Sequence, residues 1–195
     1  MKKVLVIIAC VFMTTYGFAQ DVKFGLKAGL NLANTTGSDV EDNKVNTRFY
    51  FGGFLNAPIS DIVSFQPELL ISMQGVKADV DMSDVSAAIN TSYLNIPLLF
   101  KMRLGPSNTV HFYAGPQLGF LLKAEEEVEM GDQKQTNDIK DVMNTVDFSL
   151  NLGFSFNVSE DLALDLRYNR GFTKLLEDGG KAYNSVIQLG ASYSF

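Results

Sequence analysis

The sequence has very little of the side-chain chemistry on which enzymes and metal sites depend. It contains one cysteine, Cys10, and one histidine, His111, among 195 residues. It has no nucleotide-binding loop, no hydrolase motif and no cluster with metal-ligand spacing. A single cysteine cannot form a disulfide within the chain. We therefore expect no catalytic residue, no cofactor and no metal, and we predict that the protein is not an enzyme.

Long apolar runs are also missing, apart from one short run at the N-terminus. Lys2 and Lys3 precede that run, and small residues follow it as far as Ala19. This order is typical of a secretory signal peptide, and the run is shorter than the ~17–25 residues of a membrane-anchoring helix. We predict a signal peptide over 1–19 and one exported domain over 20–195. Because no later run could form a spanning helix, a membrane location would require a β-barrel.

Positive charge is scarce as well. The chain has 22 acidic residues against 16 Lys and Arg. Removal of Lys2 and Lys3 with the signal peptide would leave 14 basic residues and a net charge of −8. An acidic exported protein lacks the basic surface that nucleic-acid binding requires. We therefore expect no nucleic-acid partner.

What the sequence does contain is a strict alternation of apolar and polar residues, clearest over 146–158. Every second residue there is large and apolar, and every residue between is polar or glycine. Side chains of a strand point to opposite faces with a period of two, so this segment has one face for hydrocarbon and one for water. A tilted strand crosses a bilayer with about 9–11 residues, and this segment is long enough.

Seven further segments show the same alternation with more irregularities. Together the eight predict an all-β fold, an eight-stranded antiparallel up-and-down transmembrane β-barrel. The connections alternate between short and long, as expected for short periplasmic turns and long extracellular loops. The longest connection, 124–145, is acidic, and we expect it to be solvated. The predicted strands cover 22–33, 48–59, 62–76, 91–104, 110–123, 146–158, 162–174 and 184–195.

The alternation alone does not say which face points outward, because a soluble exported barrel with an apolar interior has the same pattern. The polar face carries the strand glycines, which suit a narrow lumen, and mid-strand charges such as Lys27 and Glu68. The apolar face carries aromatic residues near strand ends, as in the girdles of membrane barrels. We therefore place the apolar face against lipid. These aromatic residues are Phe49, Phe112, Phe156, Tyr193 and Phe195.

The inward face also carries many charges. Eight strands leave an interior just wide enough for side chains, and a buried charge is costly unless it is paired. We therefore predict a structural ion-pair network that closes the lumen, in which Glu68 pairs with Lys27, Lys101 or Arg167. The alternative is a selective channel for small solutes. The predicted network consists of Lys23, Lys27, Glu68, Lys101, Arg103, Asp147, Asp165 and Arg167.

A third alternative is a lipid-modifying enzyme that uses His111. Lipid A deacylases resemble this chain in size and use a histidine together with a serine. His111, however, opens a predicted strand beside a short turn and faces inward. A lipid-processing site has to reach the lipid face, so we do not assign catalysis to this residue.

Four prolines fall within the predicted strands: Pro58 lies near a strand end, and Pro67, Pro97 and Pro116 lie in strand interiors. Proline removes a donor from the ladder and is normally confined to edges or bulges, whereas a closed barrel has no edge. We expect local bulges, or water from the lumen, at the three interior positions.

Five segments resemble the PorT-type outer-membrane β-barrel family of Gram-negative bacteria. The resemblance extends over essentially the whole processed chain and includes the three interior prolines. It implies a part in protein secretion or surface biogenesis. The terminal Phe195, after Tyr193, also resembles the C-terminal signal that the barrel-assembly machinery reads. The segments are FGLKAGLN (24–31), FQPELL (65–70), YLNIPLLFK (93–101), YAGP (113–116) and RYNRG (167–171).

We therefore predict a non-enzymatic protein of the cell outer membrane with a structural or interaction role. Its long loops would form the recognition surface. The expected partners are outer-membrane lipid, the barrel-assembly machinery during biogenesis, and a protein that meets the extracellular loops.

Overall fold

The computed structural model describes residues 22–37, 43–79, 85–130, 133–176 and 180–195. The predicted signal peptide, 1–19, lies outside the described residues and stays a prediction. The described residues are almost entirely strands. In chain order the elements are β1 (Lys23–Thr36), β2 (Asn43–Pro58), β3 (Val63–Asp79), β4 (Val85–Leu104), β5 (Val110–Met130), β6 (Gln133–Asp138), the 3-10 turn η2 (Lys140–Val142), β7 (Val146–Asn157), β8 (Leu162–Lys174) and β9 (Tyr183–Ser194).

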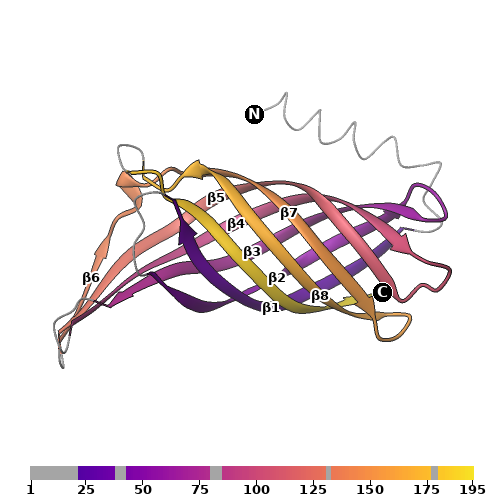
Figure 1. Cartoon of the computed structure of the whole chain (residues 1–195), viewed down its shortest axis with the longest axis horizontal. Helices are drawn as coiled ribbons and strands as arrows, with labels where there is room; N and C mark the ends of the chain where they lie inside the picture. The colour runs from indigo at the N-terminus through magenta and orange to yellow at the C-terminus, as the bar shows by residue number, and fades with distance from the viewer. Residues whose placement is uncertain (1–21, 38–42, 80–84, 131–132, 177–179) are drawn as a thin grey trace.

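Eight of these strands close into an antiparallel barrel (Figure 1). Each pairs with its neighbours along the chain, β5 pairs with β7, and β1 closes the wall by pairing with β9. The predicted eight-stranded barrel is therefore confirmed. None of the described residues forms a helix that is long and apolar enough to cross a membrane.

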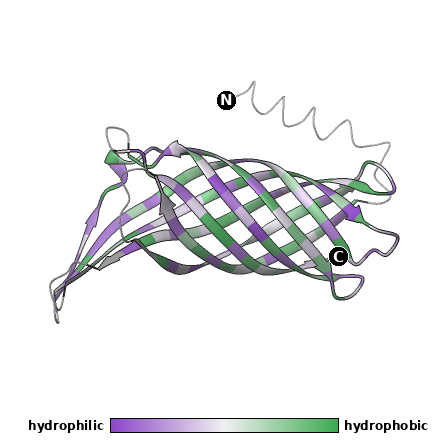
Figure 2. Cartoon of the chain, in the orientation of Figure 1, coloured by the Kyte–Doolittle hydropathy of each residue, from purple (hydrophilic) through white to green (hydrophobic). Residues whose placement is uncertain are grey.

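The alternation of the sequence becomes an alternation of exposure. In β7 exposed and buried residues alternate through almost the whole strand, with Leu150 and Leu152 exposed and Asn151 fully buried. Figure 2 shows the same pattern as hydrophobic and hydrophilic bands that alternate along the strands of the barrel. The apolar face therefore points outward, and the polar face fills the lumen.

The acidic segment 124–145 differs from the expectation of a purely solvated loop. β5 continues to Met130, and β6 returns beside it with Glu125 opposite Asp138 and Glu129 opposite Lys134. The neighbouring strands β3 and β4 continue with it, so a small sheet projects beyond the barrel (Figure 1). We call this sheet the β-arm; it comprises 75–79, 85–90, 125–130 and β6.

Three prolines interrupt the ladders of neighbouring strands. Pro67, Pro97 and Pro116 lie in β3, β4 and β5, and on one side of each of them two consecutive residue pairs are not bridged. The same register resumes beyond each gap, so the missing proline N–H is sufficient to explain it. The expectation of bulges at these prolines was wrong, because the register shifts of the described ladders lie nearer the long loops.

Candidate functional site

Four charged side chains meet inside the lumen. Lys27 of β1 donates from Nζ to Glu68 Oε1 over 3.0 Å. Arg167 of β8 donates from Nη2 to both carboxylate oxygens of Glu68, each at 2.8 Å. Lys27 Nζ also lies 3.4 Å from Asp165 Oδ1. These two cations and two carboxylates form a charge-balanced set, which we call the central cluster.

The central cluster is sealed from solvent, and polar neighbours add hydrogen bonds to its carboxylates, while Arg167 Nη1 is buried without a hydrogen-bond partner among the described residues. Its four members are between 2% and 5% exposed. Gln66 Nε2 donates to Glu68 Oε1 over 2.7 Å, and Ser192 Oγ donates to Asp165 Oδ2 over 2.8 Å. Buried ions are tolerated when their attraction and added hydrogen bonds offset the loss of hydration. This arrangement meets both conditions.

Aromatic rings pack around the cluster. The Arg167 guanidinium lies 5.1 Å from the centroid of the Tyr113 ring, and its Nε donates to Tyr113 Oη over 3.4 Å. Lys27 Nζ lies 5.7 Å from the ring centroids of both Tyr113 and Phe54. Such cation–π contacts add to the stabilisation of desolvated cations.

The lumen glycines make room for these rings. A Cβ atom added at Gly25 would lie 2.2 Å from the Phe54 ring, and one added at Gly153 would lie 2.6 Å from the Tyr113 ring. A Cβ atom at Gly190 would lie 2.1 Å from Tyr50 Oη. The glycines therefore allow large rings to fill a narrow lumen, which is why they gather on the inward face.

Four of the eight predicted network residues lie outside the central cluster. Lys101 donates to Ser155 Oγ over 3.2 Å instead of contacting Glu68. Within the described residues Lys23, Arg103 and Asp147 form no ion pair. Asp147 lies near the opposite, long-loop end, where Gly119 is its register partner on β5. The structure thus brings together Lys27, Glu68, Asp165 and Arg167, and it pairs Glu68 with two of the three predicted cations.

A layer of amide and hydroxyl side chains fills the lumen beyond the central cluster, and the sequence analysis missed it. Asn31 Nδ2 donates to Ser72 Oγ over 2.9 Å, and Gln188 Nε2 donates to Asn31 Oδ1 over 2.7 Å. Asn169 Nδ2 donates to Asn151 Oδ1 over 3.0 Å. The signal was available in the sequence, since these uncharged polar residues alternate with the same parity as the charges.

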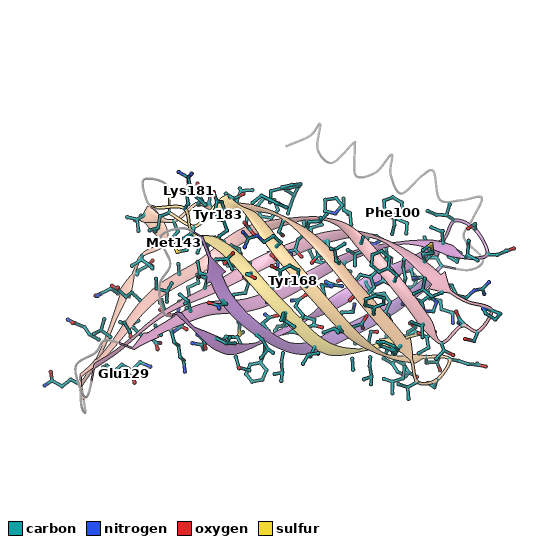
Figure 3. All side chains as sticks on the ribbon, in the orientation of Figure 1. Phe100, Glu129, Met143, Tyr168, Lys181 and Tyr183 are labelled. Atoms are coloured by element: carbon teal, nitrogen blue, oxygen red, sulfur yellow. The ribbon has the colours of Figure 1, made fainter. Side chains whose placement is uncertain are left out.

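Apolar side chains close the end of the barrel beside the long loops. Met143, which follows η2, is 3% exposed and packs with Tyr93, Leu121 and Ala124. Met143 also bridges to Leu176, so the segment after β6 folds back over the opening. Figure 3 shows Met143 at this end of the barrel, with Glu129 near the tip of the β-arm.

Ion pairs hold the projecting β-arm together. Lys134 of β6 lies 3.1 Å from Glu127 and 3.7 Å from Glu129 on β5. Lys123, just below the β-arm, lies 2.7 Å from Glu125 on the same strand. The hydrogen bond from Lys134 holds the pKa of Glu127 below its usual range. All six side chains of β6 are exposed. The β-arm is therefore ordered by pairing across strands while it stays open to water.

The C-terminal residue, Phe195, contacts both β1 and β9. Phe195 is 72% exposed, its N–H donates to Phe24 O over 2.7 Å, and its ring lies 5.2 Å from the Tyr193 ring. Its role as an assembly signal stays a prediction.

No three His, Cys, Asp or Glu side chains in the described part of the chain are placed to hold a metal ion.

The fold and the filled lumen define a small transmembrane β-barrel with an apolar outer wall. Residues 18–177 match the family described as outer membrane protein beta-barrel domain. The chain belongs to this family, and the protein is located in the outer membrane. No curated protein matches the chain.

Two solved outer-membrane proteins have a similar fold. Ail, the attachment invasion locus protein of Yersinia pestis, superposes with a TM-score of 0.53 at 12% identity, covering 89% of this chain and 98% of that one. A second Ail structure, in complex with the heparin analogue sucrose octasulfate, gives 0.56 at 12% identity and covers 90% and 100% of the two chains. Neisserial surface protein A gives 0.55 at 14% identity over 88% and 97%. At these identities the likeness is one of fold.

Proposed function

We propose that the protein is a non-enzymatic binding protein of the outer membrane whose recognition surface is the β-arm. The observation that carries this proposal is that ordered strands continue past the barrel on the side of the long connections, which faces the cell exterior in barrels of this kind. The lumen, by contrast, is occupied by the central cluster and its aromatic neighbours. The working surface is therefore expected outside the barrel rather than inside it.

The free edge of β6 indicates how a partner would bind. Within the described residues β6 pairs only with β5, so its other edge offers unpaired N–H and C=O groups. Such an edge accepts an extended segment of another chain as an added strand. The partner would contribute its backbone to the sheet and its side chains to the neighbouring charges.

The charge of the β-arm indicates the chemistry of that segment. Carboxylates outnumber cations on the parts of β5 and β6 that belong to the β-arm, which carry four glutamates over 125–129 and Asp138 against Lys134. An acidic surface attracts and orients a basic partner. We therefore expect an extended polypeptide segment rich in Lys and Arg. Ail was crystallised with a sulfated ligand, but an acidic β-arm disfavours such a polyanion here.

The resemblance to the PorT-type family gives this binding role a setting. It supports a part in protein secretion or surface biogenesis, in which the partner would be a component or a passenger of the export apparatus. The barrel-assembly machinery and outer-membrane lipid remain the expected partners of the barrel itself.

The test removes the part of the β-arm that β5 and β6 form while keeping the barrel. Ile139 N–H donates to Ala124 O over 3.1 Å, so a two-residue Asn-Gly turn can replace 125–138 and join these residues as a hairpin. A photo-crosslinking residue is placed at Gln135 of the intact protein in cells. It should form a crosslink to a partner protein, within an extended segment that is rich in Lys and Arg. The shortened protein should have an unchanged unfolding midpoint but should no longer co-purify that partner.

A matched variant separates shape from charge. Changing Glu125, Glu126, Glu127 and Glu129 to Gln should keep the strands and weaken capture. Undiminished co-purification with the shortened protein would overturn the proposal.

Planar-bilayer recording tests the channel alternative, which a stable, ion-selective conductance from the unmodified protein would establish.

A further inference from the structure

The opposite end of the barrel contains a cavity that the proposed function does not use. It opens beside the short turns, has a volume of about 220 Å³, and is lined by inward side chains of several strands. One water molecule occupies about 10–15 Å³ of such cavity volume, so the cavity can hold a small ligand together with water. In barrels of this kind the short turns face the periplasm, and we call this space the mouth cavity.

Three cations line the mouth cavity without an ion pair in the part of the chain that the structure describes: Lys23, which is exposed, and Lys101 and Arg103, which are half-buried. Lys101 donates only to the neutral Ser155 hydroxyl, over 3.2 Å. Within the described residues the Arg103 side chain donates no hydrogen bond, and its Nε is buried without a partner. The central cluster cannot neutralise them, because its carboxylates Glu68 and Asp165 are already matched by two cations. Half-buried cations without a counterion favour an anion beside them.

His111 adds an unpartnered polar atom to the same wall. It is 9% exposed, lines the mouth cavity, and is the register partner of Arg103. Its Nε2 lies 3.0 Å from Asn108 Oδ1. Because that oxygen is an acceptor, Nε2 carries the proton of the neutral ring, and Nδ1 has a lone pair. Nδ1 is buried without a hydrogen-bond partner.

We propose that the mouth cavity binds a small oxyanion, and that phosphate matches it best. Phosphate oxygens accept hydrogen bonds from Arg103 and Lys101. Monohydrogen phosphate also carries one O–H group, which can donate to His111 Nδ1. Sulfate and a carboxylate lack that donor at neutral pH, so they would leave Nδ1 unsatisfied.

The rim of the cavity restricts the size of the ligand. Asp61, Glu160 and Asp161 line it from the two neighbouring turns, and all three are exposed. None of them forms an ion pair with Lys101 or Arg103 in the described part of the chain. Their charges are screened by water, but they would repel an extended polyanion. The geometry therefore favours free phosphate over the headgroup of an anionic lipid or a polymer.

The test uses the only histidine of the chain as a reporter. The folded full-length barrel, labelled with ¹⁵N in nanodiscs of zwitterionic lipid, is titrated with sodium phosphate, sulfate or chloride at constant ionic strength. The His111 imidazole resonances should shift and saturate with phosphate. Arg103→Gln and Lys101→Gln should each weaken phosphate binding, with a Kd about tenfold higher or more, which is the loss expected for a charge-assisted hydrogen bond. Lys123→Gln, in the part of β5 remote from the mouth cavity, should leave phosphate binding unchanged.

Unfolding of the unmodified protein provides a second measurement that needs no variant. A ligand that binds only the folded state stabilises it increasingly as the ligand concentration rises above the Kd, so phosphate should raise the urea midpoint above that in chloride. Shifts of His111 that are identical in phosphate and chloride, with no change of midpoint, would overturn the site. An equal response to sulfate would overturn the assignment to phosphate. Phosphatidic acid vesicles that compete with phosphate for the His111 signal would overturn the preference for the free ion.

Discussion

The two halves of the barrel wall follow the same alternating pattern but are held together differently. The ladders β5–β7 and β9–β1 run without a gap, with Val110 to Phe120 and Gly25 to Thr36 paired residue by residue. The ladders β2–β3, β3–β4 and β4–β5 are each interrupted beside a proline. We call the strands β7, β8, β9 and β1 the regular half and the strands β2 to β5 the interrupted half; within the regular half the β8–β9 ladder is continuous from Leu162 to Arg170 and shifts register only beyond it, towards the long loop.

The comparison shows what side chains in the lumen contribute. Glu68 belongs to the interrupted half, and both of its partners, Lys27 and Arg167, belong to the regular half. The central cluster therefore ties the two halves together across the lumen. The buried ion pairs of the cluster do not depend on the ladders, so they offset the stability that the wall loses through its missing backbone hydrogen bonds.

The largest expected effect comes from cutting that tie. Glu68→Ala should destabilise the folded barrel by about 3–5 kcal/mol, because Lys27 and Arg167 would remain buried without their carboxylate. Urea unfolding in liposomes measures the loss. Glu127→Ala, which removes an exposed ion pair of the β-arm, is the matched control and should leave the barrel midpoint unchanged. A loss below about 1 kcal/mol at Glu68 would mean that the halves hold together without the cluster.

The next effect concerns the outer face, on which the two halves should not differ. Leu152 of β7 and Leu98 of β4 are 43% and 40% exposed and lie near the middle of the membrane-facing wall. Arginine at either position should cost about 2–4 kcal/mol, since lipid rather than the ladder sets the penalty. Unfolding of Leu152→Arg and Leu98→Arg in the same liposomes compares them. Tolerance of arginine at Leu98 alone would show that the interrupted half does not face lipid there.

A smaller effect is expected from filling a glycine gap in each half. Gly190→Ala in β9 would bring a methyl group to 2.1 Å from Tyr50 Oη and 2.6 Å from Ala28 O. Overpacking of this kind costs about 1–3 kcal/mol. Gly53→Ala in β2 meets nothing closer than 3.5 Å and should be neutral or slightly stabilising. Equal losses in urea unfolding would show that Tyr50 moves aside freely.

The regular half is also the part that the sequence predicts best. The predicted segment 162–174 is identical to β8, and 146–158 exceeds β7 by one residue. β4 and β5 were predicted too short. The alternation of apolar and polar residues arises where one face of a strand contacts lipid, and the β-arm is surrounded by water, so its residues do not alternate. Glu68 pairs with Lys27 and Arg167 rather than with Lys101 because of the register between distant strands. No local pattern contains that register, so the cluster's membership needed the structure.

The smallest effect should come from repairing one interruption. Pro97→Val keeps a buried apolar side chain at a position that is fully buried, and it restores an N–H directed towards the unbridged neighbour Glu68 on β3. A new backbone hydrogen bond stabilises the folded state by about 0.5–1.5 kcal/mol. Loss of the proline ring raises the conformational entropy of the unfolded chain, which lowers stability by about 0.4–1 kcal/mol. The midpoint in urea should therefore change little. Hydrogen exchange gives the sharper measurement, because the amides of Glu68 and Leu69 should exchange more slowly once the ladder is continuous. A loss of stability as large as that of Gly190→Ala, with faster exchange, would show that the proline ring itself stabilises the interrupted half.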